Sequence, residues 1–541
     1  MPLRLPSGLL LLAVLLAPSA ARAQTFTASN LPILVVTTAG GQAVPDEPKI
    51  AGRLVVRDRG AGQRNALTDV PALDVAIGIE RRGSTSQTLS PKDPYGIETR
   101  DAAGADLDVA LLGMPKESDW VLLAPYSDKS LMRDVLAYEI ARRTGRYASR
   151  FRFVELVLNG DYVGVYVVLE KIKRDKNRVP IAKLNPTDVA GDALTGGYLL
   201  KLDKTTGSPS GGWTSPFRSD VGRDVYVQYD DPDEGDLVDV QEAYIRDWML
   251  RFETMLAAPT APAEYARWIE TGSWIDFMIV NELARNVDGY RLSTFFHKQR
   301  DSDGGRLVMG PAWDFNIAFG NANYYDGART AGFQYTLRLP DDPFQTPFWW
   351  RALMADANFR GALGTRWAAL RRGPLHADSL AAFVGAHAGL LSEAQGRNFR
   401  RWPILGTYVW PDPYLETSYA DEVAYLQRWT RERAAWLDAN FPPPAPTAAD
   451  GLAAPGDVTV GVPAPNPATG RTTISVTLGR PTRLRAIAYD ALGRRVATLC
   501  DGDAAGTLAL GFDVGALAPG VYVVRIDGEG VRETRRVVRT R

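Results

Sequence analysis

Hydrophobic residues follow a helical spacing over residues 273–285, and this pattern predicts a largely buried helix. Ser273 is followed three residues later by Asp276, a spacing typical of a capped helix start, so we expect the helix to begin at Ser273. Polar and apolar residues then alternate over residues 293–298 and 307–310, which predicts two strands around an Asp/Gly turn. The pattern therefore predicts a buried helix followed by a β-hairpin.

Further elements are predicted upstream, where apolar residues alternate or recur with helical spacing. The dipeptide Asn159-Gly160 supplies the positive φ angles that a tight hairpin turn requires. The predicted elements are a strand at residues 74–80, a helix from Ser127 or Asp128 to Arg143, a hairpin at residues 151–170 and a strand at residues 197–203. Helices and strands are thus mixed along the chain, which predicts an α+β fold.

The first residues of the chain have the order of a secretory signal. Arg4 precedes an apolar run at residues 9–17, and Ala21-Arg22-Ala23 follows it. We expect residues 1–23 to be a signal peptide that is cleaved after Ala23. The apolar run is about half as long as a membrane-spanning helix, and no other run of that length follows. We therefore expect no transmembrane segment in the mature protein.

The carboxyl-terminal part of the chain differs in composition from the large region at residues 24–441. Residues 442–461 are rich in Pro, Ala and Gly, which predicts an extended linker. Residues 462–541 then alternate between apolar and polar positions, with a turn every eight to twelve residues, as in a small all-β sandwich. The alternating apolar positions are Ile474, Val476 and Leu478, then Leu484, Ala486 and Ala488, and finally Val521 and Val523.

Composition excludes several classes of function. The 62 basic and 63 acidic residues nearly balance and are spread along the chain, so we expect no nucleic-acid partner. The single cysteine, Cys500, lies in the carboxyl-terminal module, which excludes an intramolecular disulfide or a cysteine nucleophile in the large region. Only three histidines are present, without a helical metal-binding pair, which argues against a zinc hydrolase.

Two carboxylates flank the predicted hairpin. Asp288 follows the buried helix, and Asp314 follows the second strand and precedes Phe315. Protein kinases have the same order, in which one Asp orients the attacking hydroxyl and the other holds a metal on the phosphates. On the pattern alone, the plain alternative is that Asp288 begins a turn and Asp314 caps a helix. A glycosidase carboxylate pair is another alternative, and it requires a separation of about 5–9.5 Å.

A set of short motifs in a fixed order resembles the CotH family, the spore-coat protein H-like atypical kinases. The resemblance extends over residues 37–441. The motifs are Arg82-Gly83-Ser84, Pro91-Lys92, Arg133 within residues 128–133, residues 158–166, residues 196–200, Asn286-Val287-Asp288 and Trp313-Asp314-Phe315. The resemblance implies a two-lobed atypical protein-kinase-like domain that uses ATP and Mg²⁺.

The resemblance also implies site residues. Asp288 would be the catalytic residue, Asn286 would tie down its loop or help to hold a metal, and Asp314 would bind Mg²⁺. The candidate nucleotide-binding residues are Lys201 first and Lys92 second, the Gly/Ser turn with Arg82 and Ser84, Glu170 as a lysine partner, and Trp313 against adenine. Plain alternatives are a solvated strand lysine for Lys201 and core packing for Trp313. Ser293 stands where kinases place a second metal ligand, so the number of metals is open.

The last eighty residues resemble the C-terminal sorting domain of the type IX secretion system, through Pro465-Asn466-Pro467, Gly493-Arg494 and residues 519–522. This resemblance implies export through the outer membrane of a Gram-negative host, with the type IX secretion machinery as a partner. A carbohydrate-binding or adhesive β module is the alternative.

Taken together, these expectations describe a secreted kinase that transfers the γ-phosphoryl group of ATP to Ser or Thr of extracytoplasmic proteins. The first alternative is a surface or matrix assembly protein that has kept the kinase fold and lost turnover. The second alternative is a secreted glycosidase that uses Asp288 and Asp314.

Overall fold

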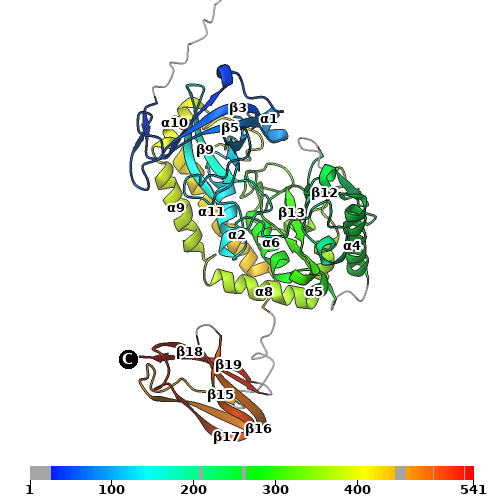
Figure 1. Ribbon diagram of the computed structural model, residues 1–541, viewed down its shortest axis with the longest axis vertical. Coiled ribbons are helices and arrows are strands. Elements are labelled where there is room, and N and C mark those ends of the chain that lie inside the picture. The colour runs from blue at the N-terminus through cyan, green and yellow to red at the C-terminus, as the bar shows by residue number, and fades with distance from the viewer. Residues whose placement is uncertain are drawn as a thin grey trace, which may run out of the picture. The chain divides into compact units, whose positions relative to one another are not determined.

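The computed structural model describes residues 26–205, 211–258, 264–444, 458–490, 493–528 and 531–540 (Figure 1). The expected signal peptide and residues 445–457 of the expected linker lie outside the described residues. The chain divides into two compact units, Met1–Pro442 and Pro443–Arg541. Helices and strands mix in the first unit, so the fold is α+β as predicted. None of the described helices is long and apolar enough to cross a membrane.

A closed β-barrel forms the amino-terminal part of the first unit. Its strands follow the order β2-β3-β5-β6-β7-β9-β8, and the barrel closes because β2 pairs in parallel with β8. The strands are β2 (Ile33–Thr38), β3 (Ile50–Arg57), β5 (Leu73–Arg81), β6 (Tyr95–Arg100), β7 (Asp119–Leu123), β8 (Phe151–Leu158) and β9 (Asp161–Glu170). Because the barrel is closed, it has no open sheet edge. Alternate apolar residues, among them Leu34, Ile77, Trp120 and Tyr166, fill its interior. The predicted strand at residues 74–80 and the predicted hairpin at residues 151–170 are both present.

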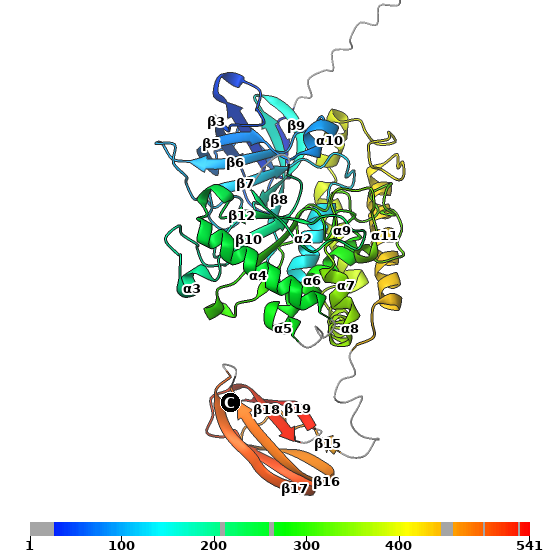
Figure 2. The same cartoon turned by 90° about the vertical axis from the view of Figure 1, so that its right-hand side faces the viewer.

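A second sheet lies in the same unit, with strand order β11-β12-β10-β13-β14. Its strands are β10 (Tyr198–Leu202), β11 (Gly212–Thr214), β12 (Tyr226–Asp231), β13 (Thr294–Lys298) and β14 (Leu307–Met309). Leu200 and Leu202 pack in one core with helix α4 (Asp239–Ala257), which covers that face of the sheet (Figure 2). Leu199 and Phe295 lie on the opposite face and contact residues that follow the barrel. The predicted hairpin at residues 293–310 is thus present, and Lys201 lies on the face away from Leu200.

The remaining short elements and helices of this unit surround the barrel and the second sheet (Figures 1 and 2). They are β1 (Ala28–Ser29), β4 (Asn65–Ala66), α1 (Thr85–Leu89), α2 (Arg133–Arg143), α3 (Gly191–Leu194), α5 (Tyr265–Trp268), α6 (Thr271–Ala284), α7 (Trp349–Ala355), α8 (Ala357–Arg371), α9 (Ala377–Leu391), α10 (Ala394–Arg401) and α11 (Tyr419–Asn440). Helices α2, α6 and α11 share one hydrophobic core, in which Trp274, Trp349 and Trp350 are fully buried.

Two helix starts differ from the prediction. Helix α6 begins at Thr271, and Glu270 is its cap, because the Glu270 carboxylate accepts a hydrogen bond from the amide of Ser273. Helix α2 begins at Arg133 rather than at Ser127 or Asp128. Asp128 still binds the helix start, since its carboxylate accepts the amide of Arg133 at 2.8 Å and pairs with the Arg133 guanidinium at 2.5 Å. Arg133 therefore makes a structural ion pair at the start of its own helix.

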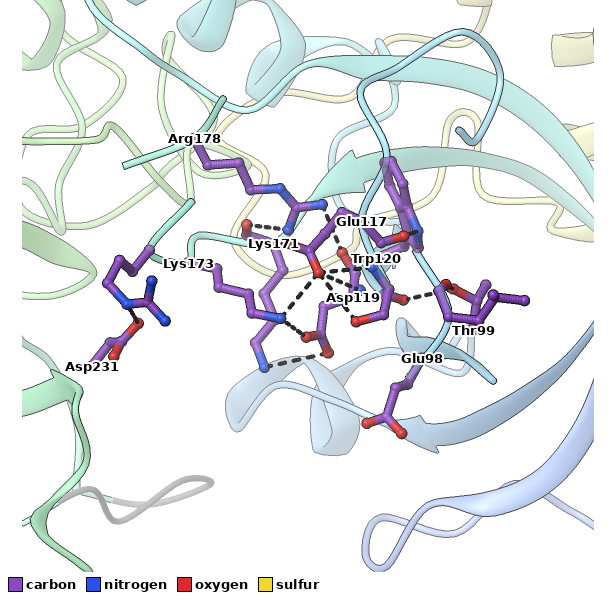
Figure 3. Close-up of polar contacts among 12 residues, drawn as sticks. Glu98, Thr99, Glu117, Asp119, Trp120, Lys171, Lys173, Arg178 and Asp231 are labelled. Atoms are coloured by element: carbon purple, nitrogen blue, oxygen red, sulfur yellow. Dashed lines mark hydrogen bonds and ion pairs between the residues drawn. The ribbon is translucent and has the colours of Figure 1, made fainter. Parts of the chain in front are cut away.

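The chain between the barrel and the second sheet is held by charged side chains. Lys173 donates to Glu117 at 3.0 Å and to Asp119 at 2.7 Å, both on the barrel side (Figure 3). Arg174 reaches the other way and lies 3.7 Å from the carboxylate of Asp231 at the end of β12. Arg178 lies over the Trp120 ring at 5.2 Å. These contacts fix the connecting segment against both sheets.

The second unit is all-β, as predicted, and its described strands are joined by hydrogen bonds into one five-stranded sheet. The strands are β15 (Val458–Val460), β16 (Arg471–Tyr489), β17 (Arg495–Asp513), β18 (Gly520–Gly528) and β19 (Val531–Arg539). The two expected segments at residues 474–478 and 484–488 are a single strand, β16, with an irregular register between them. In β18 the inward residues are Tyr522, Val524 and Ile526, and Val523 is exposed.

Candidate functional site

Two loops bring the predicted carboxylates to one end of the second sheet. Helix α6 ends where Arg285 adopts a left-handed conformation with φ of 44°, and Asp288 follows in the next turn. Asp314 follows strand β14. The side chain of Asn286 joins the two loops, because it donates to the carbonyl of Asp314 at 3.1 Å and accepts from the amide of Asp288 at 3.2 Å. Asn286 therefore holds the backbones of both loops together.

Asp314 has a left-handed backbone with φ of 62°, which costs a residue other than glycine about 1–3 kcal/mol. Side chains on both sides hold this conformation. The amide of Asp314 donates to the Tyr138 hydroxyl at 3.3 Å, and the amide of Phe315 donates to the carboxylate of Asp134 at 2.7 Å. Both acceptors project from α2, so this helix and Asn286 together bind the backbone around Asp314.

The carboxylates share a buried, negatively charged environment. Burial raises the pKa of Asp314 to about 6, and the charges of Asp288 and Asp203 contribute to the rise. Burial also raises the pKa of Asp288, against the charges of Arg291 and Lys204. Burial and the nearby charge of Asp314 raise the pKa of Asp134 to about 8. This site therefore concentrates negative charge that a bound cation would relieve.

Arg291 organises the Asp288 side of the site. Its guanidinium donates to Asp288 at 2.7 Å and to Asp342 at 3.0 Å, and the side chain is almost fully buried. Tyr325 lies against the same guanidinium and donates its hydroxyl to Asp342 at 2.9 Å. Asp288 is consequently held in one orientation by a cation that is itself fixed on its other side.

The Arg82 guanidinium and two aromatic rings lie close to the Asp314 loop. The Arg82 guanidinium lies over the Trp313 ring at 5.5 Å, and Trp313 stacks on Tyr138 with 5.9 Å between ring centroids. Burial lowers the pKa of Arg82, and the charges of Asp314 and Asp230 oppose that effect. No described carboxylate lies within ion-pairing distance of Arg82. Lys201 pairs with Asp230 at 2.9 Å on the sheet face that Leu199 also occupies.

Lys92 and Glu170 lie elsewhere and are satisfied by protein partners. Lys92 is 1% exposed and donates to the carbonyls of Pro125 and Val165 and to the side chain of Asn398. Glu170 is fully buried and pairs with Arg150 at 2.6 Å, so its cationic partner is not a lysine. We therefore assign neither residue to the nucleotide site. Ser84 lies beside Arg82 in the turn between β5 and α1.

Several residues of the site were not predicted. Asp203 and Lys204 directly follow strand β10, and the amide of Lys204 donates to the Asp203 carboxylate at 2.8 Å. The sequence could have indicated both residues, because they lie at the end of the strand predicted at residues 197–203. Asp134 and Tyr138 are spaced four apart on α2, but nothing in the sequence relates them to Asp314, which is more than 170 positions away.

The donor set suits a hard cation held jointly by the protein and a ligand. Among the residues that the structure describes, no group of three or more His, Cys, Asp or Glu side chains is arranged as a metal site. Carboxylate oxygens such as those of Asp314 suit Mg²⁺, which is commonly bound by one or two carboxylates together with phosphate oxygens. The residues present thus fit Mg²⁺ that arrives with a phosphate-bearing ligand.

The family of the chain is shown by comparison with family models. The family model described as CotH kinase protein matches residues 79–437, most of the chain, and the chain belongs to this family. A second family model, secretion system C-terminal sorting domain, matches residues 464–540. The chain is therefore a CotH-family protein that carries a type IX sorting domain, which supports secretion or a cell-surface location. No curated protein matches the chain.

Proposed function

We propose that this protein is a secreted atypical protein kinase that transfers the γ-phosphoryl group of ATP to Ser or Thr residues of extracytoplasmic proteins. The observation that carries the proposal is the junction of the Asp288 and Asp314 loops through Asn286. It is supported by Arg82, whose guanidinium lies over Trp313 next to Asp314, and by Lys201 on strand β10 of the second sheet. Phosphoryl transfer depends on such positioning and charge neutralisation more than on covalent chemistry.

Each residue has a defined role in this proposal. Asp288 orients the acceptor hydroxyl and accepts its proton, and Arg291 keeps the carboxylate in place. Asp314 is the protein ligand for Mg²⁺, and Asn286, Tyr138 and Asp134 fix its backbone. Mg-ATP, when bound, supplies the phosphoryl group and neutralises part of its charge.

Arg82, just after barrel strand β5, and Lys201, on strand β10 of the second sheet, are the candidates for phosphate contacts, and Ser84 lies in the turn beside Arg82. Trp313 is the candidate for stacking on adenine, but the Arg82 guanidinium and the Tyr138 ring already lie against it, which favours its alternative role in packing. Arg82 has no described ion-pair partner, whereas Lys201 is paired with Asp230, so Arg82 is the stronger candidate for a direct phosphate contact.

The two alternatives make different demands on the site. An assembly protein with a kinase fold would bind partner proteins without transfer, and the ion pair between Asp288 and Arg291 is compatible with that role. A glycosidase would bind a neutral sugar between the carboxylates, and an unpaired guanidinium gives no advantage there. Arg82, which has no described ion-pair partner, therefore favours a phosphate-bearing ligand over a sugar.

For localisation, we propose export by a signal peptide at residues 1–23 and then by the type IX machinery of a Gram-negative host. The sorting domain supports the second of these steps. The proposals of a Gram-negative host and of a signal peptide rest on the amino-acid sequence alone.

The proposed nucleotide site is tested by calorimetric titration of the full-length protein with ATP, with and without Mg²⁺. We expect Asp314→Ala to abolish the Mg²⁺-dependent part of binding and Arg82→Ala to weaken binding at least tenfold, because charge-assisted hydrogen bonds contribute about 1.5–3 kcal/mol each. Asp326→Ala removes an exposed carboxylate of the neighbouring loop and serves as the control. Unchanged Mg-ATP affinity in Asp314→Ala would refute the metal role.

A further inference from the structure

A loop with exposed aromatic side chains lies next to the proposed catalytic region. This aromatic loop comprises residues 406–415, between α10 and α11. Tyr408 is 54% exposed, Trp410 is 43% exposed and Leu415 is 54% exposed. Large apolar side chains exposed together on a surface are characteristic of contact sites for another molecule.

A path of direct contacts connects this loop to Asp288. Arg291 binds Asp288 at 2.7 Å, and the Tyr325 ring lies 5.4 Å from the Arg291 guanidinium. Tyr325 contacts Tyr324 with 5.0 Å between ring centroids, and Tyr324 stacks on Trp410 at 5.6 Å with nearly parallel rings. These contacts together span at most about 20 Å, and an extended peptide advances about 3.3 Å per residue, so a stretch of about six residues is long enough to reach from Asp288 to Trp410.

The aromatic loop is held rigidly in its exposed position. The ends of the loop meet where the amide of Gly406 donates to the carbonyl of Glu416 at 2.8 Å. Below the loop, Lys129 and Asp412 form a buried ion pair at 2.5 Å, and Lys129 also donates to the carbonyl of Thr407. A surface that is ordered before binding loses little conformational entropy when a partner binds.

Asn323 adds further support to the loop from the segment that follows Asp314. Its amide donates to the carbonyl of Pro411 at 2.9 Å, and its side chain donates to the Tyr408 hydroxyl at 3.0 Å. The loop is thus fixed both to the segment before α2 and to the segment after Asp314. Both segments belong to the region that positions the carboxylates.

The chemistry of the loop indicates the kind of side chain that it contacts. Asp412 is the only charged residue among residues 406–415, and it is buried against Lys129. The exposed faces are therefore uncharged and mostly apolar. An apolar side chain gains more from such a surface than a charged one, which would lose hydration without gaining a partner.

From these observations we propose that the aromatic loop is a docking site for the protein substrate. It binds an aromatic, aliphatic or proline side chain that lies within about six residues of the Ser or Thr over Asp288. This inference rests on the proposed function, because it names the part of the substrate that the same site recognises. Trp410 supplies the main contact, and Tyr408 and Leu415 extend the surface.

The test uses the full-length protein and fluorescein-labelled synthetic peptides with one central Ser. In the reference peptide, glycine occupies the six positions on either side of the Ser. In each further peptide, Leu, Phe or Pro replaces the glycine at one of these positions. Fluorescence anisotropy measures peptide binding, and calorimetry measures Mg-ATP binding to the same variants. We expect at least one position at which an apolar residue improves binding by wild type about tenfold.

We expect Trp410→Ala to lose this preference, Trp410→Phe to keep most of it, and all variants to bind Mg-ATP as wild type does. Leu250→Ala removes a comparably exposed apolar side chain from α4, on the far face of the second sheet, and serves as the matched control. If Trp410→Ala fails to fold, Tyr408→Ala tests the same surface.

The docking-site proposal is overturned if wild type shows no preference for an apolar residue at any position. It is also overturned if Trp410→Ala keeps the preference of wild type. Binding of a soluble cello- or malto-oligosaccharide that Trp410→Ala abolishes, without peptide binding, also overturns it and identifies a glycan site. A positional preference without phosphoryl transfer leaves the docking site standing and refutes the kinase proposal instead.

Discussion

Neutralising Asp314 is expected to stabilise the protein in the absence of metal, even though it destroys the proposed metal ligand. In Asp314→Asn the side chain keeps an oxygen that accepts the hydrogen bond from the Ser293 hydroxyl, but it no longer carries charge. The substitution therefore removes the burial of a carboxylate beside Asp288 and Asp203 without creating a cavity. Residues that serve function commonly reduce stability in this way.

The magnitude follows from the pKa. The folded protein raises the pKa of Asp314 from 3.8 to about 6. A difference of one pH unit between the folded and unfolded pKa corresponds to about 1.4 kcal/mol, so the ionised carboxylate costs folding about 3 kcal/mol. Because the folded pKa is raised, this cost is small below pH 3.8, grows as the pH rises from 3.8 to about 6, and stays constant above that.

The assay is urea unfolding of wild type and Asp314→Asn in EDTA at pH 4 and pH 7.5. We expect the two free energies of unfolding to differ by about 0.5 kcal/mol at the lower pH and the variant to gain about 3 kcal/mol at the higher pH. Asp326→Asn, at an exposed position, should show no such pH-dependent gain. Equal or lower stability of Asp314→Asn at pH 7.5 would refute the reasoning that the site concentrates uncompensated charge.

Two further outcomes are expected. Arg433→Met should lower the free energy of unfolding by about 3–5 kcal/mol, because it leaves the fully buried Glu282 without its cation, whereas Arg371→Met at a partly exposed pair with Asp438 should cost about 1 kcal/mol or less. Calorimetry or urea unfolding measures both, and a small effect of Arg433→Met would contradict the importance of that pair. Deletion of residues 462–541 should retain the protein in the periplasm, as fractionation of the proposed host would show; continued export would disprove the sorting role.

The local elements around the site could be predicted because their signals are local. The apolar helix before Asp288 and the strand pair at residues 293–310 follow from periodicity, and Asn159-Gly160 marks a hairpin whose turn has φ of 50° at Asn159. Lys201 lies on the sheet face away from Leu200, and this follows from the alternation of side chains along a strand alone. These predictions needed no knowledge of distant contacts.

The remaining features depend on contacts between positions far apart in the sequence. The barrel closes through the parallel pairing of β2 with β8, which no turn signal announces. Lys92 is a nucleotide candidate through the family resemblance, and no signal in the sequence relates it to Asn398, its acceptor 306 positions away. Likewise, Asp134 belongs to the site only because α2 packs beside the Asp314 loop, and in the sequence it is an acidic residue in the first turn of a helix, which is a common position for Asp.

The central claim is that Asp288 serves phosphoryl transfer, and the most direct measurement follows labelled γ-phosphate from Mg-ATP to the protein itself or to co-secreted proteins. General-base assistance is worth about 10²- to 10⁴-fold, so Asp288→Asn is predicted to slow transfer by that factor while Mg-ATP binding and fold are retained. Transfer by Asp288→Asn at the wild-type rate would show that Asp288 is not the catalytic residue. A wild-type protein that neither binds nucleotide nor transfers phosphate with Mg²⁺ or Mn²⁺ would contradict the kinase account and leave the assembly role.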